Sequence, residues 1–176
     1  ALQIGLSKTR YPFETMAKYG ADATRWYMIT NAPPWDNLKF DEEGITEVQR
    51  KYFRALHNTY AFFALYANVD GFNHSEASID VANRPEIDRW VLSRLNSLVK
   101  DVEESYENYE PTRAGRAIQD FVVDELSNWY VRLCRRRFWK GEYTEDKISA
   151  YQTLYQCLIT ISKLSAPIAP FYSDNL

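Results

Sequence analysis

The segment TEVQRKYFRALHNTYAFFALYAN (residues 46–68) decides the fold class of this chain. Its mainly apolar positions recur at steps of three and four residues, which is the spacing of one face of an α-helix. These positions are Val48, Tyr52, Ala55, Leu56, Thr59, Tyr60, Phe63, Tyr66 and Ala67. A helix of about six turns that is apolar on one side has to bury that side against other elements.

The segments on either side predict more helices, because glycine is scarce and sits at their boundaries. Proline opens two of the long helices, where its missing N–H costs nothing, and Thr144 is expected to cap the last one. We expect long helices over 85–109, 111–140 and 144–166, and short ones over 12–20 and 21–32. The sequence therefore predicts an all-α fold, an antiparallel bundle of four long helices preceded by two short helices.

Composition and charge exclude several classes of protein. The formal charge of −3 argues against a uniformly basic nucleic-acid-binding coat, although it leaves room for a local basic patch. Cys134 and Cys157 lie apart without metal-ligand spacing, so we expect reduced thiols in the core. No apolar run reaches the ~18–20 residues of a membrane span, and no signal peptide opens the chain. We expect a soluble cytoplasmic protein that does not contact a membrane.

Both ends of the sequence look cut. The chain begins with ALQIGLSK and stops at APFYSDNL, where a helix has just begun after Pro170. We expect an excised piece of a larger protein, whose first residues can be a cloning remnant.

The segment LSNWYVRLCRRRFWKG (126–141) interleaves positive charges with aromatic rings inside the third long helix. On a helical wheel at about 100° per residue, the side around Leu126 is the core side. That side is expected to hold Val122, Val123, Trp129, Tyr130 and Leu133. The outward stripe is expected to hold Asn128, Arg132, Arg135, Arg136 and Trp139, with Lys140 past its edge near the helix end. Arg137 projects toward the core side, where we expect it to pair with a carboxylate or a helix end.

Two interpretations of this stripe compete. Basic residues near a helix C-terminus can simply complement the helix dipole as a solvated face. However, three arginines on one face repel one another, and a tryptophan is costly to leave in water. Guanidinium groups bind phosphates with two parallel hydrogen bonds, and indole rings stack on bases. The stripe therefore favours RNA binding, with arginines on phosphates and Trp139 and Asn128 on bases.

No catalytic site is expected in this chain. Six scattered glycines cannot form a phosphate-binding loop, and two histidines without companion cysteines give no zinc pattern. His57 lies in a helix among apolar residues, so we expect it at the boundary of the core or inside it and not in a catalytic triad.

Four long segments closely resemble the region that follows the catalytic domain of isoleucyl-tRNA synthetases, a class I family. They are GADATRWYMITNAPPWDNLKFD (20–41), RKYFRALHNTYAFFALYANVDGF (50–72), ELSNWYVRLCRRRFW (125–139) and AYQTLYQCLITISKLSAPIAPF (150–171). The resemblance covers roughly residues 12–176. It implies a stem-contact segment at 1–44 and an anticodon-binding helical bundle at 45–176. The implied partners are the anticodon arm of tRNA(Ile) and the catalytic domain of the same chain.

The resemblance also implies what the chain lacks. Leu6-Ser7-Lys8 is similar to part of the ATP-binding loop of the family, but it lies about four residues too close to Pro12. The nucleotide-binding fold and its signature are missing, so we expect no cofactor here and no aminoacylation by this piece alone. ATP and magnesium belong to the parent enzyme. Two alternatives remain open: a helical module that binds an acidic protein partner, and the equivalent domain of a valyl or leucyl enzyme.

Overall fold

The computed structural model describes residues 12–176. Within this range the fold is all-α, as predicted, and the described residues form no strand. The helices are α1 (Pro12–Tyr19), α2 (Ala21–Asn31), α3 (Glu42–Val48), α4 (Arg54–Asp70), α5 (Glu86–Glu107), α6 (Pro111–Asp120), α7 (Arg132–Trp139), α8 (Glu145–Ser165) and α9 (Pro170–Asn175). Wider π-helical segments join α3 to α4 (Gln49–Phe53) and α6 to α7 (Phe121–Val131), so each pair forms one continuous rod.

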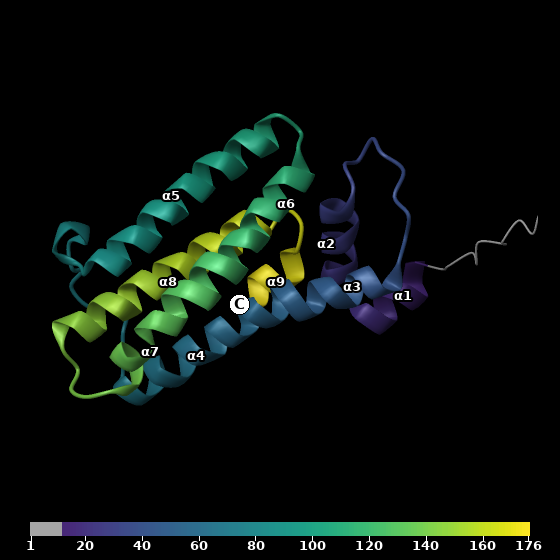
Figure 1. Ribbon diagram of the computed structural model, residues 1–176. Helices are drawn as coiled ribbons and strands as arrows, with labels where there is room; N and C mark the ends of the chain where they lie inside the picture. Colours follow the sequence, from purple (N-terminus) through teal and green to yellow (C-terminus); the bar gives the residue numbers. More distant parts are fainter. Residues whose placement is uncertain (1–11) are drawn as a thin grey trace, which may run out of the picture.

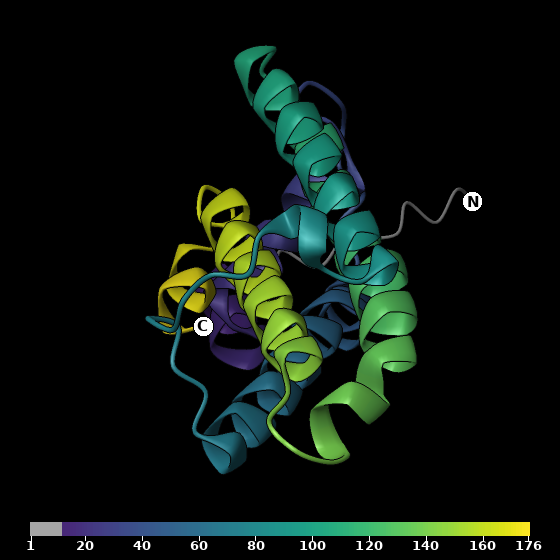
Figure 2. The ribbon, with the colours of Figure 1, turned by 90° about the vertical axis from the view of Figure 1, so that its left-hand side faces the viewer.

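The four long rods lie roughly side by side, and consecutive rods run in opposite directions (Figure 1). The rod of α3 and α4 leads into α5, which turns back into the rod of α6 and α7, and α8 returns beside them. In the view turned by 90°, α8 lies beside the other rods, and it packs against α4, α5 and α7 (Figure 2). The short helices α1 and α2 lie together at one end.

The core follows from the apolar stripes of these rods. Fully buried side chains from all four rods meet in one cluster, among them Leu56, Leu95, Leu126 and Leu154. The short helix α2 joins the same cluster, because the Trp26 ring stacks on Tyr52 with centroids 4.1 Å apart. Helix α2 is therefore packed into the bundle.

The predicted helices are present, and their ends differ by a few residues. The first long helix begins at Glu42, earlier than expected, because the Asp41 carboxylate accepts a hydrogen bond from the Glu43 amide at 3.0 Å and caps it. Thr144 occupies the N-cap position of α8 as predicted, but its side chain makes no capping hydrogen bond. The predicted division of the chain after residue 44 falls inside α3 and stays a prediction.

Several smaller predictions have outcomes here. Cys134 and Cys157 are free and buried, as predicted, and burial raises the pKa of both thiols. The expectation for His57 was wrong, because this side chain points to solvent from α4. Leu6-Ser7-Lys8 lies outside the described residues. Between 12 and 176, no helix is long and apolar enough to cross a membrane.

Candidate nucleic-acid interface

The rod of α6 and α7 carries the predicted interface, and its buried residues recur every four positions. Ile118, Val122, Leu126, Tyr130, Cys134 and Phe138 are each at most 2% exposed. In a regular α-helix, five such steps would rotate the last side chain about 200° away from the first. The π-helical segment Phe121–Val131 has wider turns, which keep all six side chains on one face.

All six predicted interface residues lie on the solvent side of this rod. Asn128 belongs to the π-helical segment, and Lys140 follows the end of α7. The side chains of Asn128, Arg132, Arg135, Arg136, Trp139 and Lys140 are all exposed. Trp139 keeps 58% of its surface in solvent. Whether these residues bind RNA stays a prediction.

The guanidinium groups on this surface are largely free. Across residues 12–176, the side chains of Arg132 and Arg136 make no ion pair and no hydrogen bond. Arg135 lies over the Phe62 ring of α4, with its Cζ atom 6.0 Å from the ring centroid. Unpaired guanidinium groups can accept an anionic ligand without first breaking an internal ion pair.

The wheel placed two residues on the wrong side. Trp129 and Leu133 were expected in the core, but each keeps 55% of its surface exposed. Val122 and Tyr130 are buried as predicted, and Val123 is half-buried. The error has a physical cause, because a wheel at about 100° per residue does not apply to a π-helical segment. The apolar residues at intervals of four were the available signal.

The exposed surface is therefore wider than the predicted stripe. We call it the α7 face, and it consists of Asn128, Trp129, Arg132, Leu133, Arg135, Arg136, Trp139 and Lys140. Arg132 and Arg136 follow Trp129 by three and seven residues, so they share its side of the helix. Arg135, which approaches α4, marks the other side.

Arg137 turns inward, as the sequence predicted. Its two terminal nitrogens donate hydrogen bonds of 2.6 and 2.9 Å to the carboxylate of Asp88, which is fully buried. Its Nε atom donates to Asp146 at the start of α8. Burial opposes the charged form of Arg137, but its bonds to Asp88 outweigh this and raise the pKa of the guanidinium.

The Asp88 carboxylate is the centre of a buried network. Besides Arg137, it accepts hydrogen bonds from the Tyr130 hydroxyl at 2.8 Å and the Ser149 hydroxyl at 2.7 Å. Burial, and then the negative charge of Asp88, raise the pKa of Tyr130 well above its usual value. The network ties α5, α7, α8 and the π-helical segment together. It holds the α7 face in a fixed orientation.

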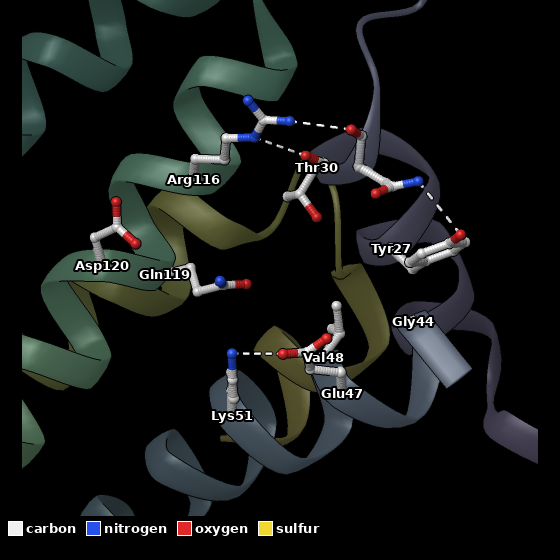
Figure 3. Close-up of a pocket in the computed structure, with 10 residues that line it drawn as sticks. Tyr27, Thr30, Gly44, Glu47, Val48, Lys51, Arg116, Gln119 and Asp120 are labelled. Carbon is white, nitrogen blue, oxygen red and sulfur yellow. Dashed lines mark hydrogen bonds and ion pairs between the residues drawn. The ribbon is translucent and has the colours of Figure 1, made fainter. Parts of the chain in front are cut away.

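Away from the α7 face, a concave region lies between α2, α3 and α6 (Figure 3), with a volume of about 340 Å³. Arg116 donates hydrogen bonds to the carbonyl oxygens of Thr30 and Asn31, and so caps the end of α2. Lys51 pairs with Glu47 on the opposite wall. Arg116, Lys51 and Glu47 thus already have partners, and the contact of Arg116 with the end of α2 attaches that helix to the bundle.

The described residues also bring together no group of three or more His, Cys, Asp or Glu side chains that could hold a metal ion.

Comparison with known proteins places this geometry in context. Residues 88–176, which include the whole rod of α6 and α7, match the family described as "Anticodon-binding domain of tRNA ligase". The isoleucine–tRNA ligase of Cytophaga hutchinsonii is 72% identical over 165 residues, which cover 94% of this chain and 15% of that protein. The isoleucine–tRNA ligase of Bacteroides thetaiotaomicron is 67% identical, with 94% of this chain and 14% of that protein covered. The chain thus spans about one seventh of the length of these curated relatives.

A solved structure has the same fold. It is the crystal structure of a LeuRS–tRNA–LeuAMS ternary complex from Agrobacterium radiobacter, with a TM-score of 0.65. The match covers 94% of this chain and 19% of that one at 18% sequence identity. The likeness concerns the arrangement of the helices.

Proposed function

The chain belongs to the family of anticodon-binding domains of tRNA ligases, and from this premise we propose that it is the tRNA-recognition part of an isoleucine–tRNA ligase. The two relatives that are 72% and 67% identical to the chain support isoleucine as the amino acid of the parent enzyme. The parent would act in the cytoplasm, where it transfers activated isoleucine to tRNA(Ile). ATP and magnesium would bind in its catalytic domain, outside the residues described above.

The α7 face would grip the anticodon arm. Arg132, Arg135 and Arg136 would hold phosphates, since a planar guanidinium group matches two phosphate oxygens at once. Trp139 and Asn128 would engage unpaired bases, because sequence-specific RNA recognition uses bases that are splayed out of a helix. Lys140, just beyond the end of α7, would add a further phosphate contact. Phosphate contacts would position the RNA, and base contacts would select it.

The N-terminal segment would connect this grip to the catalytic domain of the same chain. We assign residues 1–44 to the stem-contact segment and 45–176 to the anticodon-binding bundle. The stacking of Trp26 on Tyr52 and the cap that Arg116 places on α2 support a rigid connection. A rigid connection would fix the distance between the anticodon grip and the catalytic domain. This piece alone would not aminoacylate.

One observation carries the proposal: Arg132 and Arg136 are exposed and unpaired within residues 12–176, while the neighbouring Arg137 is held inside. If these arginines only complemented the helix dipole in solvent, there would be no need for one to be paired inside while the others stay free. The free arginines and the exposed aromatic rings lie on one surface, which suits a polyanion with unpaired bases.

The proposal is tested by a titration of the 176-residue chain with three anticodon stem–loops, those of isoleucine, valine and leucine tRNAs. We expect the isoleucine stem–loop to bind most tightly. Preference for the valine or leucine stem–loop would assign the chain to that enzyme instead. Equal binding of all three would favour a helical module for an acidic protein partner and contradict the proposal.

A further inference from the structure

We propose that Trp129, supported by Trp90, forms a second base-stacking position on the α7 face, distinct from the one assigned to Trp139. This inference rests on the proposed RNA-binding function and extends it to a residue that the sequence had placed in the core. The occupant is one unpaired nucleotide of the bound RNA.

The first argument is the exposure of the Trp129 ring. Tryptophan in water is unfavourable, yet Trp129 keeps 55% of its surface exposed, and Leu133 one turn later is equally exposed. Both residues lie on a rod that buries Ile118, Val122, Leu126, Tyr130, Cys134 and Phe138 at intervals of four. An apolar pair that stays exposed on an otherwise well-packed helix indicates a surface kept for a ligand.

The second argument is the support behind the ring. Trp90 of α5 is half-buried and packs against the main core cluster. Its ring lies 6.4 Å from that of Trp129, centroid to centroid, with the two planes inclined by 55°. A ring that leans on an anchored neighbour loses little freedom when a base stacks on it, so binding costs less entropy.

The third argument is charge, which selects RNA over an apolar protein partner. Arg132 and Arg136 lie on the same side of the helix as Trp129, and Arg89 is exposed next to Trp90. The Glu125 carboxylate, one turn before Trp129, is neutralised by Arg94 through hydrogen bonds of 2.8 and 2.6 Å. The ring is therefore bordered by free positive charges and by a paired carboxylate. A phosphate on either side of a stacked base would meet a guanidinium group.

The distance between Trp129 and Trp139 indicates that the two rings would stack on different nucleotides. Trp129 and Trp139 are ten residues apart, or about 15 Å along an α-helix. Bases in one stacked strand rise about 3.4 Å per nucleotide along the strand axis, so the rings would meet nucleotides about four steps apart. Arg132 and Arg136 fall between the rings, where the intervening phosphates would run.

The test uses Trp129→Ala and Trp129→Phe in titrations with the isoleucine anticodon stem–loop. We expect Trp129→Ala to weaken binding about 5- to 150-fold, because a stacked base is worth ~1–3 kcal/mol. The slope of affinity against salt should stay unchanged, since no phosphate contact is lost. Trp129→Phe should recover most of the affinity. Tyr109→Ala is the control, because Tyr109 is also an exposed aromatic ring and lies between α5 and α6, outside the α7 face and the stem-contact segment.

A second readout separates stacking from a structural role. Stem–loops that lack one base at a time should include one position at which Trp129→Ala causes no further loss of affinity. If Trp129→Ala binds as tightly as the native chain while the arginine variant Arg135→Ala with Arg136→Ala binds weakly, this inference is wrong and the proposed function stands. Loss of affinity with every abasic stem–loop alike would also overturn the inference, because it would indicate a change in the fold. If neither the arginine nor the tryptophan variants alter binding, the proposed function fails as well.

Discussion

Arg137 and Asp88 form a doubly hydrogen-bonded ion pair between the end of α7 and the start of α5. The two bonds measure 2.6 and 2.9 Å, and the Asp88 side chain is completely buried. The pair explains why one arginine of the run at 135–137 turns inward and its two neighbours do not. It fixes the rotation of α7 about its own axis, and so decides which side chains meet solvent.

The first prediction concerns this pair. Asp88→Asn should lower the free energy of unfolding by about 3 kcal/mol or more, because Arg137 would lose its buried carboxylate partner and keep only the exposed carboxylate of Asp146. Urea denaturation measures the loss. Glu125→Gln breaks the Arg94–Glu125 pair, whose arginine side chain is 50% exposed, and should cost less than about 1 kcal/mol. Equal losses in the two variants would contradict the central role of Asp88.

The second prediction concerns the salt dependence of RNA binding. Arg135→Ala combined with Arg136→Ala should weaken binding and reduce the log–log slope against salt by about 1.4, at ~0.7 per lost phosphate contact. Titrations at two or more salt concentrations measure the slope. The control is Lys100→Ala with Lys163→Ala, which removes two exposed charges near the far ends of α5 and α8. A control that lowers the slope as much would mean that total charge matters and the α7 face does not.

The third prediction concerns Trp139. Trp139→Ala should cost ~1–3 kcal/mol of RNA-binding free energy if the ring stacks on a base. Its effect on the free energy of unfolding should stay within about 0.5 kcal/mol, since 58% of the residue is exposed. The buried Trp26 gives the contrast, because Trp26→Ala should destabilise the fold by about 3–5 kcal/mol. Calorimetric binding and chemical denaturation separate the two effects. Unfolding of the Trp139 variant would mean that the ring belongs to the core.

The fourth prediction concerns the contact between α2 and α6. A methyl group added at Gly115 would lie 2.7 Å from Cγ2 of Thr30 and 3.2 Å from Cδ1 of Ile168. Replacing an exposed glycine in a helix by alanine stabilises the fold by about 1 kcal/mol. Gly115→Ala should instead destabilise it, because the added methyl group overlaps with its neighbours. Thermal unfolding measures the effect. Adding Thr30→Ser removes the obstructing methyl and should restore stability, and failure to restore it would show that the overlap is not the cause.

The fifth prediction concerns alkaline pH. Burial raises the pKa of Tyr106 to about 12, and its hydroxyl donates a hydrogen bond of 3.1 Å to the Leu164 carbonyl. The unfolded chain has the ordinary tyrosine pKa of about 10. The stabilising contribution of the neutral hydroxyl is therefore complete below pH 10 and is lost as pH rises from 10 through 12. Tyr106→Phe should flatten the decline of stability over this range, and Tyr109→Phe, an exposed ring, should not.

The sequence predicted the fold well because the fold depends on periodicity and on helix ends. The stripe of the first long helix, the prolines that open helices and Gly141 after α7 all lie where the sequence placed them. The π-helical segments were not predicted, since neither carries a residue type that marks a wider turn. In Phe121–Val131 the signal was the spacing of apolar residues at intervals of four, which a wheel at about 100° per residue does not use.

The unpredicted π-helical segment also limited the prediction of the interface. The six predicted residues are all exposed, and Arg137 found the carboxylate expected for it. Trp129 and Leu133 were placed in the core because the wheel assumed a regular α-helix. Asp88 was not singled out, because its distance of 49 residues from Arg137 leaves no local trace in the sequence.

The wide turns between Phe121 and Val131 set the direction in which the side chains of α7 point. The same residues wound as a regular α-helix, at about 100° per residue, would rotate α7 away from its present face. Arg137 would then leave Asp88, and the exposed arginines would sweep toward a neighbouring helix. The proposed RNA binding would then be lost although none of the proposed binding residues had been changed.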